Sequence, residues 1–339
     1  MTGSASCVSD ASRKMAKVSL TMIVKNEEAN LPRCLSSVAG LPIHETIIVV
    51  DTGTTDRTRE VALDYGARVY DDPWGEDYSA ARNQSLRHAS GDWFFWLDAD
   101  DSFDAANRDK LGQLLEHLDG DVHAYVLYQQ NELVPSLTKF LTSTSAGAEF
   151  LKKWRAVGHP KLVRRIPGVC FRHRIHEVPA WPVAGGEPSI LDSGISFQHR
   201  GYLDLATAER KVCRNRRIAV KDLLDHPDHK RSVAIFFRQY TETEIDPEPS
   251  PALWIEDGFY VPSCPLSSLF HRLSVDPKKL RAQLRRHPDD VAGWVVLTIL
   301  YCRQGLQTQA LRTARRGLSH CDSQALTDLE AELRSFHSL

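Results

Sequence analysis

The stretch from Trp93 to Asp101, Trp-Phe-Phe-Trp-Leu-Asp-Ala-Asp-Asp, joins five apolar residues directly to a group of carboxylates. A continuous apolar run of this length predicts a strand that is covered on both faces, as strands of parallel sheets are. In such sheets, ligands bind beyond the carboxyl ends of the strands. The stretch therefore predicts a buried strand that ends at a binding site.

The flanking sequence repeats a pattern of strand and helix. Apolar runs rich in β-branched and aromatic residues predict further strands over residues 18–24, 46–50, 67–70, 122–128, 161–165 and 190–197. Amphipathic segments with capping residues predict helices over residues 26–38, 56–65 and 78–88, and from about 104. This alternation predicts an α/β fold with a Rossmann-like, mainly parallel sheet flanked by helices.

The pattern changes near residue 205, after which helices are predicted throughout. Their expected ranges are 206–224, 232–244, 278–287, 290–303, 308–319 and 323–336. Trp294, Leu297, Tyr301, Gly305 and Ala310 have the spacing of one tetratricopeptide unit, and a generic helical bundle remains the alternative. We therefore predict a flexible tail over 1–16, an α/β domain over 17–204 and a helical, tetratricopeptide-like domain over 205–339.

Composition excludes several classes of protein. Lys and Arg number 42 and Asp and Glu 44, and this net charge of −2 argues against nucleic acid as a partner. The seven cysteines include no Cys-x-x-Cys pair, which favours reduced thiols. The polar N-terminus does not resemble a signal peptide, and no apolar run reaches the roughly 20 residues of a transmembrane helix. A soluble, cytoplasmic protein is expected.

Asp98 and Asp100 are the strongest candidates for chemistry. Two carboxylates one residue apart repel each other, and a hard divalent cation such as Mg²⁺ or Mn²⁺ removes that repulsion. Because Mg²⁺ completes its coordination shell with water and phosphate oxygens, the pair predicts a metal–diphosphate site. Asp51, at the end of another predicted strand, is a candidate for binding a base or ribose, or a turn former. Arg82 is expected to approach a phosphate or to form a surface ion pair.

Four motifs in this order carry a family resemblance: Leu20-Thr-Met-Ile-Val-Lys-Asn-Glu-Glu28, Ile48-Val-Val-Asp-Thr-Gly-Thr-Thr-Asp56, Asp77-Tyr-Ser-Ala-Ala-Arg-Asn83 and Gly91-Asp-Trp-Phe-Phe-Trp-Leu-Asp-Ala-Asp-Asp101. They resemble the family 2 glycosyltransferases, in a branch with a tetratricopeptide-like tail. The resemblance implies a GT-A fold over 17–204 and inverting hexosyl transfer. It also implies a UDP- or GDP-sugar donor and Mn²⁺ or Mg²⁺ as cofactor.

The resemblance also implies roles for individual residues. The nucleotide-sugar would be bound by Ile23, Lys25, Glu27, Asp51, Arg82, Asp98 and Ala99. The metal would be held by Asp98 and Asp100 in an Asp-x-Asp motif, with His199 as a further ligand, although a plain packed histidine is the alternative there. Thr52 stands where many relatives carry a second acid, so one carboxylate is available at that point.

Inverting transfer needs a base that removes the acceptor proton. Glu177 is the predicted base and His176 the alternative or an orienting partner, while a structural ion pair with Arg172 or Arg174 is the rival interpretation. These two arginines, with Arg164 and Arg165, are expected to face the acidic edge across a cleft. The spacing Cys170-x-x-His173-x-x-His176 matches no known zinc cage, and a zinc site is not expected there.

The acceptor stays open among glycans, lipid-linked intermediates, peptides or proteins, and small metabolites. A tetratricopeptide-like tail favours a peptide or protein partner and is compatible with a homodimer. Two other functions remain as alternatives. A nucleotidyltransferase would use a similar sheet, but the acidic segment Val24-Lys-Asn-Glu-Glu28 counts against it. A non-catalytic, peptide-binding scaffold would leave the carboxylates of the sheet without a role.

Overall fold

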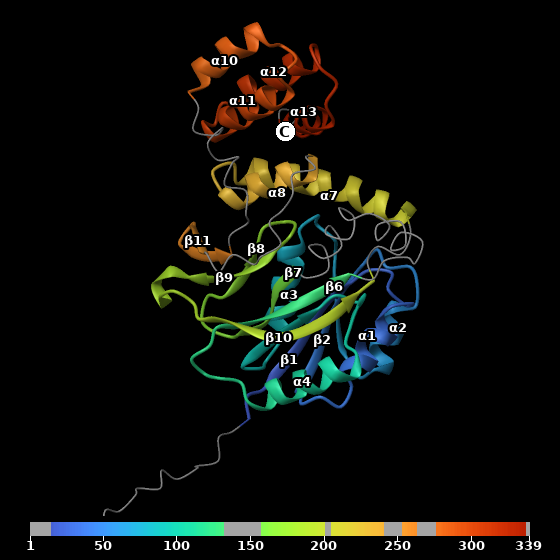
Figure 1. Cartoon of the computed structure of the whole chain (residues 1–339). Helices are drawn as coiled ribbons and strands as arrows, with labels where there is room; N and C mark the ends of the chain where they lie inside the picture. The colour runs from blue at the N-terminus through green and yellow to red at the C-terminus, as the bar shows by residue number, and fades with distance from the viewer. Residues whose placement is uncertain (1–14, 132–156, 201–204, 241–252, 263–275, 337–339) are drawn as a thin grey trace, which may run out of the picture.

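The structure is a computed structural model that describes residues 15–131, 157–200, 205–240, 253–262 and 276–336 (Figure 1). The predicted tail therefore lies almost wholly outside the described residues. Within these ranges, no helix is both long and apolar enough to cross a membrane.

The main sheet has eight strands. They are β1 (Val18–Val24), β2 (Glu45–Asp51), β3 (Arg68–Asp72), β4 (Trp93–Leu97), β5 (Asp101–Ser102), β6 (Ala124–Asn131), β7 (Val157–Arg164) and β10 (Ile190–His199). Their order is β3-β2-β1-β4-β7-β6-β10-β5. Only β7 and β5 oppose the direction of the other strands of this sheet, so it is mixed and mainly parallel, as predicted.

Helices cover both faces of this sheet (Figure 1). The four that flank it are α1 (Leu31–Val38), α2 (Thr58–Asp64), α3 (Tyr78–His88) and α4 (Ala105–Glu116). Alternate strand residues point to opposite faces, so Ile48 joins the core formed with α1, α2 and α4, while Ile47 packs with Phe94 and the end of α3. The prediction that a helix begins at Asn26 is wrong. Asn26 has a φ of 52°, and its side chain accepts a hydrogen bond from the Thr55 amide instead.

A second, antiparallel sheet was not predicted. It contains β8 (Cys170–Arg172), β9 (Val178–Pro182), β11 (Leu253–Glu256) and β12 (Phe259–Pro262) in the order β11-β12-β9-β8. Asp257 and Gly258 both have positive φ, as the primed turn of a two-residue hairpin requires. The β11–β12 hairpin interrupts the region predicted to be helical and extends a sheet that begins in the α/β part.

The remaining elements are helices close to their predicted ranges. They are α7 (Leu205–Asp225), α8 (Lys230–Tyr240), α10 (Pro277–Arg286), α11 (Val291–Arg303), α12 (Gln307–Leu318) and α13 (Gln324–Phe336). Trp294 packs against Gly317, where an added Cβ would lie 2.9 Å from the Trp294 side chain. Helices α7 and α8 lie between the sheets and the α10–α13 group (Figure 1). Helices α7 and α8 thus pack against the α/β part of the chain on one side and against α10–α13 on the other.

Candidate functional site

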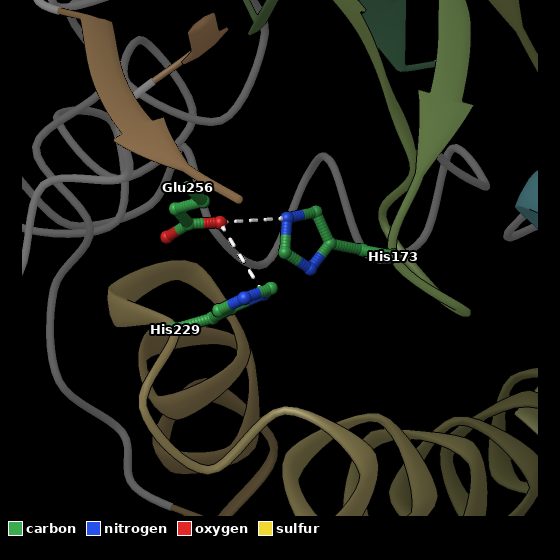
Figure 2. Close-up of side chains that lie close together, drawn as sticks. All are labelled: His173, His229 and Glu256. Atoms are coloured by element: carbon green, nitrogen blue, oxygen red, sulfur yellow. Dashed lines mark ion pairs between the residues drawn. The ribbon is translucent and has the colours of Figure 1, made fainter. Parts of the chain in front are cut away.

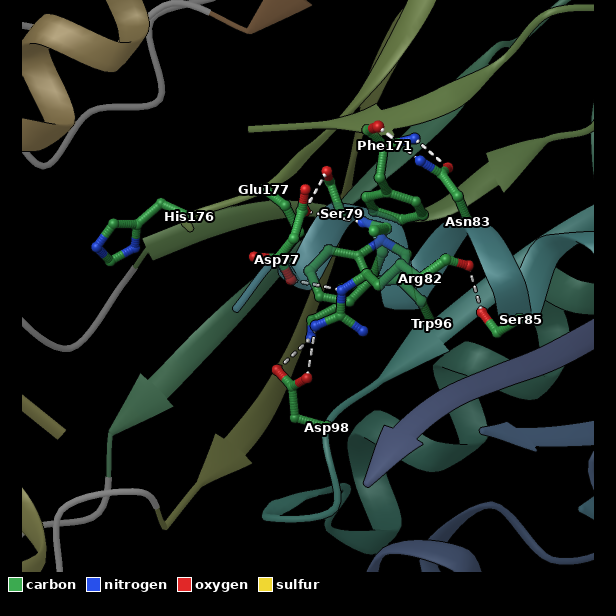
Figure 3. A network of polar contacts seen from close by, with 12 residues as sticks. Asp77, Ser79, Arg82, Asn83, Ser85, Trp96, Asp98, Phe171, His176 and Glu177 are labelled. Carbon is green, nitrogen blue, oxygen red and sulfur yellow. Dashed lines mark hydrogen bonds and ion pairs between the residues drawn. The ribbon is translucent and has the colours of Figure 1, made fainter. Parts of the chain in front are cut away.

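Arg82 joins two of the predicted carboxylates. It projects from α3, whose first turn is capped by the Asp77 side chain, and it is 4% exposed. Its Nε lies 2.5 Å from Glu177 Oε1 and its Nη2 lies 2.6 Å from Asp98 Oδ1 (Figure 3). The guanidinium also lies 4.2 Å from the centre of the Trp96 ring. Burial alone would lower the pKa of Arg82, but the two carboxylates raise it above its usual range.

Lys161 is a second buried cation at the same place, and it is not among the site residues predicted from the sequence. Its Nζ lies 2.9 Å from Asp101 Oδ2 and 3.5 Å from Asp98 Oδ2, and the side chain is 1% exposed. Burial would raise the pKa of Asp98, yet Lys161 and Arg82 hold it well below the ordinary value. The sequence contains one signal for this residue, because Lys161 directly precedes the apolar residues Leu162 and Val163 of a predicted strand. An unpaired buried ammonium is very costly, so a lysine buried there is expected to have a carboxylate partner.

A third group contains Asp100, Asp101 and His199, whose candidate ligand atoms lie within 4.8 Å of one another. The antiparallel pairing of β10 with β5 places His199 opposite Asp101. His199 Nδ1 lies 2.9 Å from Asp101 Oδ1 and 3.3 Å from Asp100 Oδ1. Lys211 Nζ, 3.7 Å from Asp100 Oδ2, was also missed. The structure thus brings His199 to Asp100, whereas Asp98 faces Arg82 and Lys161.

The electrostatics of this group follow from burial and from its crowded charges. Burial raises the pKa of Asp100, and the neighbouring carboxylates of Asp101 and Asp98 raise it further against the opposing effect of His199. Burial would lower the pKa of His199, but the hydrogen bond with Asp101 and the charge of Asp100 raise it. Excess negative charge at Asp100 is the condition in which a cation binds favourably.

The residues predicted to contact the nucleoside lie at the neighbouring strand ends. Lys25 follows β1 and its Nζ lies 2.5 Å from Asp51 Oδ2 at the end of β2. Burial would raise the pKa of Asp51, but the hydrogen bond from the Gly53 amide and the contact with Lys25 lower it. Glu27 is half-buried, and burial raises its pKa. These carboxyl ends meet because β2, β1 and β4 are adjacent and parallel.

The two hydrophobic members of the predicted nucleotide set are also at this edge. Ile23 lies in β1 opposite Val49 and is partly exposed. Ala99 is 4% exposed between the two acids of the Asp-x-Asp motif. The structure therefore gathers at one edge the residues predicted to bind the nucleotide-sugar.

The adjacent candidates His176 and Glu177 separate in space. They lie between β8 and β9, where His176 has a φ of 51° and its Nε2 lies 3.1 Å from Gln239 Nε2. The His176 side chain points away from Arg82, toward which Glu177 points (Figure 3). Glu177 is the one of the two that reaches the carboxylate edge.

The expected set of arginines across the cleft is wrong. Arg164 is opposite Trp93 because β7 is antiparallel to β4, which places it at the amino end of the parallel strands, and Arg165 donates to the Ala89 carbonyl. Arg172 pairs with Asp257 at 2.7 Å, and Arg174 pairs with Asp225 at 2.5 Å. Glu177 therefore pairs with Arg82, and not with Arg172 or Arg174 as the rival interpretation has it.

Comparisons with known proteins find similarity to glycosyltransferases in the part of the chain that contains most of the parallel strands. Residues 19–159 match the model of Glycosyl transferase family 2. A TPR repeat-containing protein of Synechococcus elongatus is 49% identical over 87 residues, which cover 26% of this chain and 21% of that protein. The SPbeta prophage-derived glycosyltransferase SunS of Bacillus subtilis is 30% identical over 100 residues, which cover 29% and 23%. The chain thus spans about a fifth of the length of these curated relatives.

Solved structures are similar at lower identity. Glucosyl-3-phosphoglycerate synthase of Mycobacterium tuberculosis, in complex with Mn²⁺, UDP and glucosyl-3-phosphoglycerate, is 14% identical with a TM-score of 0.38, and the match covers 74% of this chain and 87% of that one. S. aureus TarS 1-349 is 14% identical with a TM-score of 0.38, and the match covers 95% and 91%. The family match over residues 19–159 and the mainly parallel sheet flanked by helices lead to one conclusion: this part of the chain is similar to the family 2 glycosyltransferases, and a helical region follows it.

Proposed function

We propose that the chain transfers a hexosyl group from a UDP- or GDP-sugar to an acceptor hydroxyl, with inversion at the anomeric carbon and with Mn²⁺ or Mg²⁺ as cofactor. The observation that carries the proposal is the position of Arg82 between Glu177 and Asp98. One buried cation holds the predicted acceptor-side carboxylate beside the predicted donor-side carboxylates. If a donor binds at the carboxylate edge, Glu177 would lie close to the sugar that is transferred, and this supports a displacement by an acceptor oxygen.

Asp100 and His199 are the residues that best fit a divalent cation. They offer a carboxylate oxygen and an imidazole nitrogen 3.3 Å apart, and Mn²⁺ accepts both kinds of ligand. Asp98, also predicted as a ligand, directs one oxygen to Arg82 and the other to Lys161. We therefore assign Asp98 to charge balance and orientation. A cation at Asp100 and His199 would stabilise the negative charge that develops on the leaving diphosphate.

Glu177 is proposed as the base. Its carboxylate accepts the proton of the acceptor hydroxyl while the acceptor oxygen attacks the anomeric carbon and the bond to the diphosphate breaks. The Arg82 guanidinium orients this carboxylate, which is 10% exposed, and thereby reduces the reorganisation that proton transfer would need. His176 points elsewhere in the structure, which favours Glu177.

Lys25 and Asp51 are proposed to contact the base and ribose of the donor. Their 2.5 Å ion pair holds the Asp51 carboxylate at the strand end, where it can accept hydrogen bonds from an imide or from ribose hydroxyls. Ile23 and Ala99 would pack against apolar faces of the nucleotide.

Thermal shift with UDP and GDP, with and without Mn²⁺, tests the donor site. A ligand that binds only the folded state raises Tm, so one nucleotide should raise Tm in a Mn²⁺-dependent manner. No shift with any nucleotide diphosphate would contradict the proposal and would favour the peptide-binding scaffold. Release of pyrophosphate from a nucleoside triphosphate, rather than of a nucleoside diphosphate from a sugar nucleotide, would favour the nucleotidyltransferase.

A further inference from the structure

A second group of metal-ligating side chains lies away from the carboxylate edge. His173 follows β8, His229 immediately precedes α8, and Glu256 is the last residue of β11. Their exposed fractions are 5%, 8% and 6%. Figure 2 shows the two imidazoles and the carboxylate converging on one point from these three elements. The chain thus brings together three strong ligands from separate segments, a group that no single spacing in the sequence reveals.

The converging atoms contact one another as ion pairs, with Glu256 Oε2 near both His173 Nε2 and His229 Nδ1, but without the geometry of a hydrogen bond. Within the described part of the chain, His173 Nε2, His229 Nδ1 and Glu256 Oε2 are all buried atoms without a hydrogen-bond partner. An unsatisfied buried polar atom typically costs about 1–3 kcal/mol. Three such atoms that face one another are the kind of ligand set that a metal ion between them would satisfy.

The distances among these atoms fit a small tetrahedral cation. Glu256 Oε2 lies 3.2 Å from His173 Nε2 and 3.8 Å from His229 Nδ1. Two ligands about 2.0–2.1 Å from a tetrahedral Zn²⁺ are separated by roughly 3.3–3.4 Å. These two separations bracket that value, and all three ligand atoms lie within 4.8 Å of one another, so a zinc ion fits with side-chain movements.

The atoms on the far sides of the ligands have the partners that zinc sites usually provide. His173 Nδ1 lies 3.4 Å from Asp222 Oδ2 and 3.3 Å from Ser232 Oγ. His229 Nε2 lies 3.0 Å from Asp257 Oδ2. A carboxylate on the second nitrogen of a histidine fixes the tautomer and orients the ring toward a metal. Both histidines have such a carboxylate.

The third ligand is oriented in the same way. Glu256 Oε1 accepts a hydrogen bond of 3.0 Å from the Arg231 amide, which leaves Oε2 directed at the two imidazoles. Each of the three side chains therefore has a polar partner on the side away from the other two. His173 Nε2, His229 Nδ1 and Glu256 Oε2 are directed to the common point (Figure 2).

We propose that His173, His229 and Glu256 bind one zinc ion, with a water molecule as the fourth ligand. Two imidazoles and one carboxylate form a known three-residue ligand set for zinc. This site differs from the proposed donor-site metal in its ligands and in its elements, and it does not depend on the glycosyltransferase proposal.

The zinc ion would join three parts of the chain next to the proposed base. His173 and Glu177 lie on the same connection between β8 and β9, and the Arg231 side chain donates to the His176 carbonyl at 2.8 Å. Zinc binding would hold this connection against α8 and the β11–β12 hairpin. The ion would thus act as a structural clamp that positions Glu177.

The metal-free alternative is an imidazolium at His173. Burial would lower the pKa of His173, but Asp222 and Glu256 raise it, so a protonated ring between two carboxylates is the competing state. That state leaves His229 Nδ1 without a role. Metal analysis separates the two states, because only the proposed site retains zinc.

The first test uses the untagged full chain, expressed with zinc and dialysed without chelator. Elemental analysis should find about one zinc ion per chain, and removal by a strong chelator should lower Tm by several degrees, with recovery on adding Zn²⁺. Co²⁺ in place of zinc should give visible d–d absorption of a tetrahedral site. Zinc content near zero, together with no uptake of Zn²⁺ or Co²⁺, would overturn the proposal without reliance on any variant.

Variants then assign the ligands. Glu256→Gln and His229→Gln should each reduce retained zinc at least tenfold. His226→Gln is the matched control, because His226 stacks on His229 at 4.6 Å and forms another candidate group with His229 and Asp257. Asp100→Asn is the control for the donor site. Both controls should retain zinc, and loss of zinc in either would contradict the assignment.

Discussion

The Nε atom of Arg82 lies 2.5 Å from a carboxylate oxygen of Glu177, although 95 residues separate the two in the chain. Arg82 comes from the first turns of α3, and Glu177 comes from the connection between two strands of the small sheet. The ion pair is nearly closed to solvent, with side-chain exposures of 5% and 10%. It joins the parallel sheet, where a donor is proposed to bind, to the segment proposed to contact the acceptor.

Arg82→Ala should destabilise the protein and abolish transfer. Removing one partner of a buried ion pair leaves an uncompensated charge and costs about 3–5 kcal/mol, here at two carboxylates. Urea unfolding measures the loss. Arg57→Ala is the control, since Arg57 pairs with Glu60 at the exposed surface, and its unfolding midpoint should not change. Equal midpoints for both variants would contradict the role given to Arg82.

Glu177→Gln should lower kcat by about 10²–10⁴-fold with little change in the KM of the donor, because a general base acts in the transition state. Steady-state kinetics of transfer measures both constants. Glu187→Gln changes an exposed glutamate of the same region and should leave kcat unaltered. His176→Ala should retain most activity. A larger loss in that variant than in Glu177→Gln would transfer the role of base to His176.

Lys161→Met should cost about 3–5 kcal/mol of stability, because Asp101 is fully buried beside this ammonium. Guanidinium unfolding measures the difference. Lys110→Met, at an exposed position of α4, serves as the control of the same substitution type. A Lys161 variant as stable as the wild type would mean that Asp98 and Asp101 are neutralised by other groups.

The lowered pKa of Glu45 predicts that the stability of the protein depends on pH. Burial would raise the pKa of Glu45, but hydrogen bonds from Ser19, Ser90 and Arg68 lower it from 4.5 to about 2. A lowered pKa in the folded state stabilises the protein above the unfolded value of 4.5, and this contribution is lost as the pH falls to about 2. Glu45→Gln should therefore be less stable than the wild type at pH 7.

The stability difference between Glu45→Gln and the wild type should shrink as the pH falls from 4.5 toward 2. Urea unfolding at a series of pH values measures it. Glu60→Gln, whose side chain is 63% exposed, should show no such trend. A difference for Glu45→Gln that stays constant over this range would contradict the lowered pKa.

Much of the fold follows from local sequence pattern. The ranges of β1, β4 and α3 agree with their predictions because each has a strong local cause: an unbroken apolar run for β4, a segment rich in apolar and β-branched residues for β1, and the Asp77 cap for α3. Strand direction has no such local signal. The antiparallel direction of β7 was not predicted, and it places Arg164 at the amino edge while Lys161 reaches the carboxylates.

Part of the candidate site is also predictable from local sequence pattern. Asp51 and Asp98 follow apolar strands, so the shared edge was expected from parallel pairing. Their partners depend on tertiary contacts between distant segments, as Arg82 with Glu177 and His199 with Asp101 show. The Asp257-Gly258 pair is a sequence signal for a two-residue hairpin, and it is absent from the predictions above.

The most direct measurement compares hydrolysis of UDP- and GDP-sugars by the purified wild type and by Asp100→Asn, with and without Mn²⁺. Release of a nucleoside diphosphate from the donor needs no acceptor. We expect slow, Mn²⁺-dependent release by the wild type and none by Asp100→Asn, with unchanged far-UV circular dichroism. Equal release by both proteins, or release that is independent of the metal, would contradict the proposed donor site.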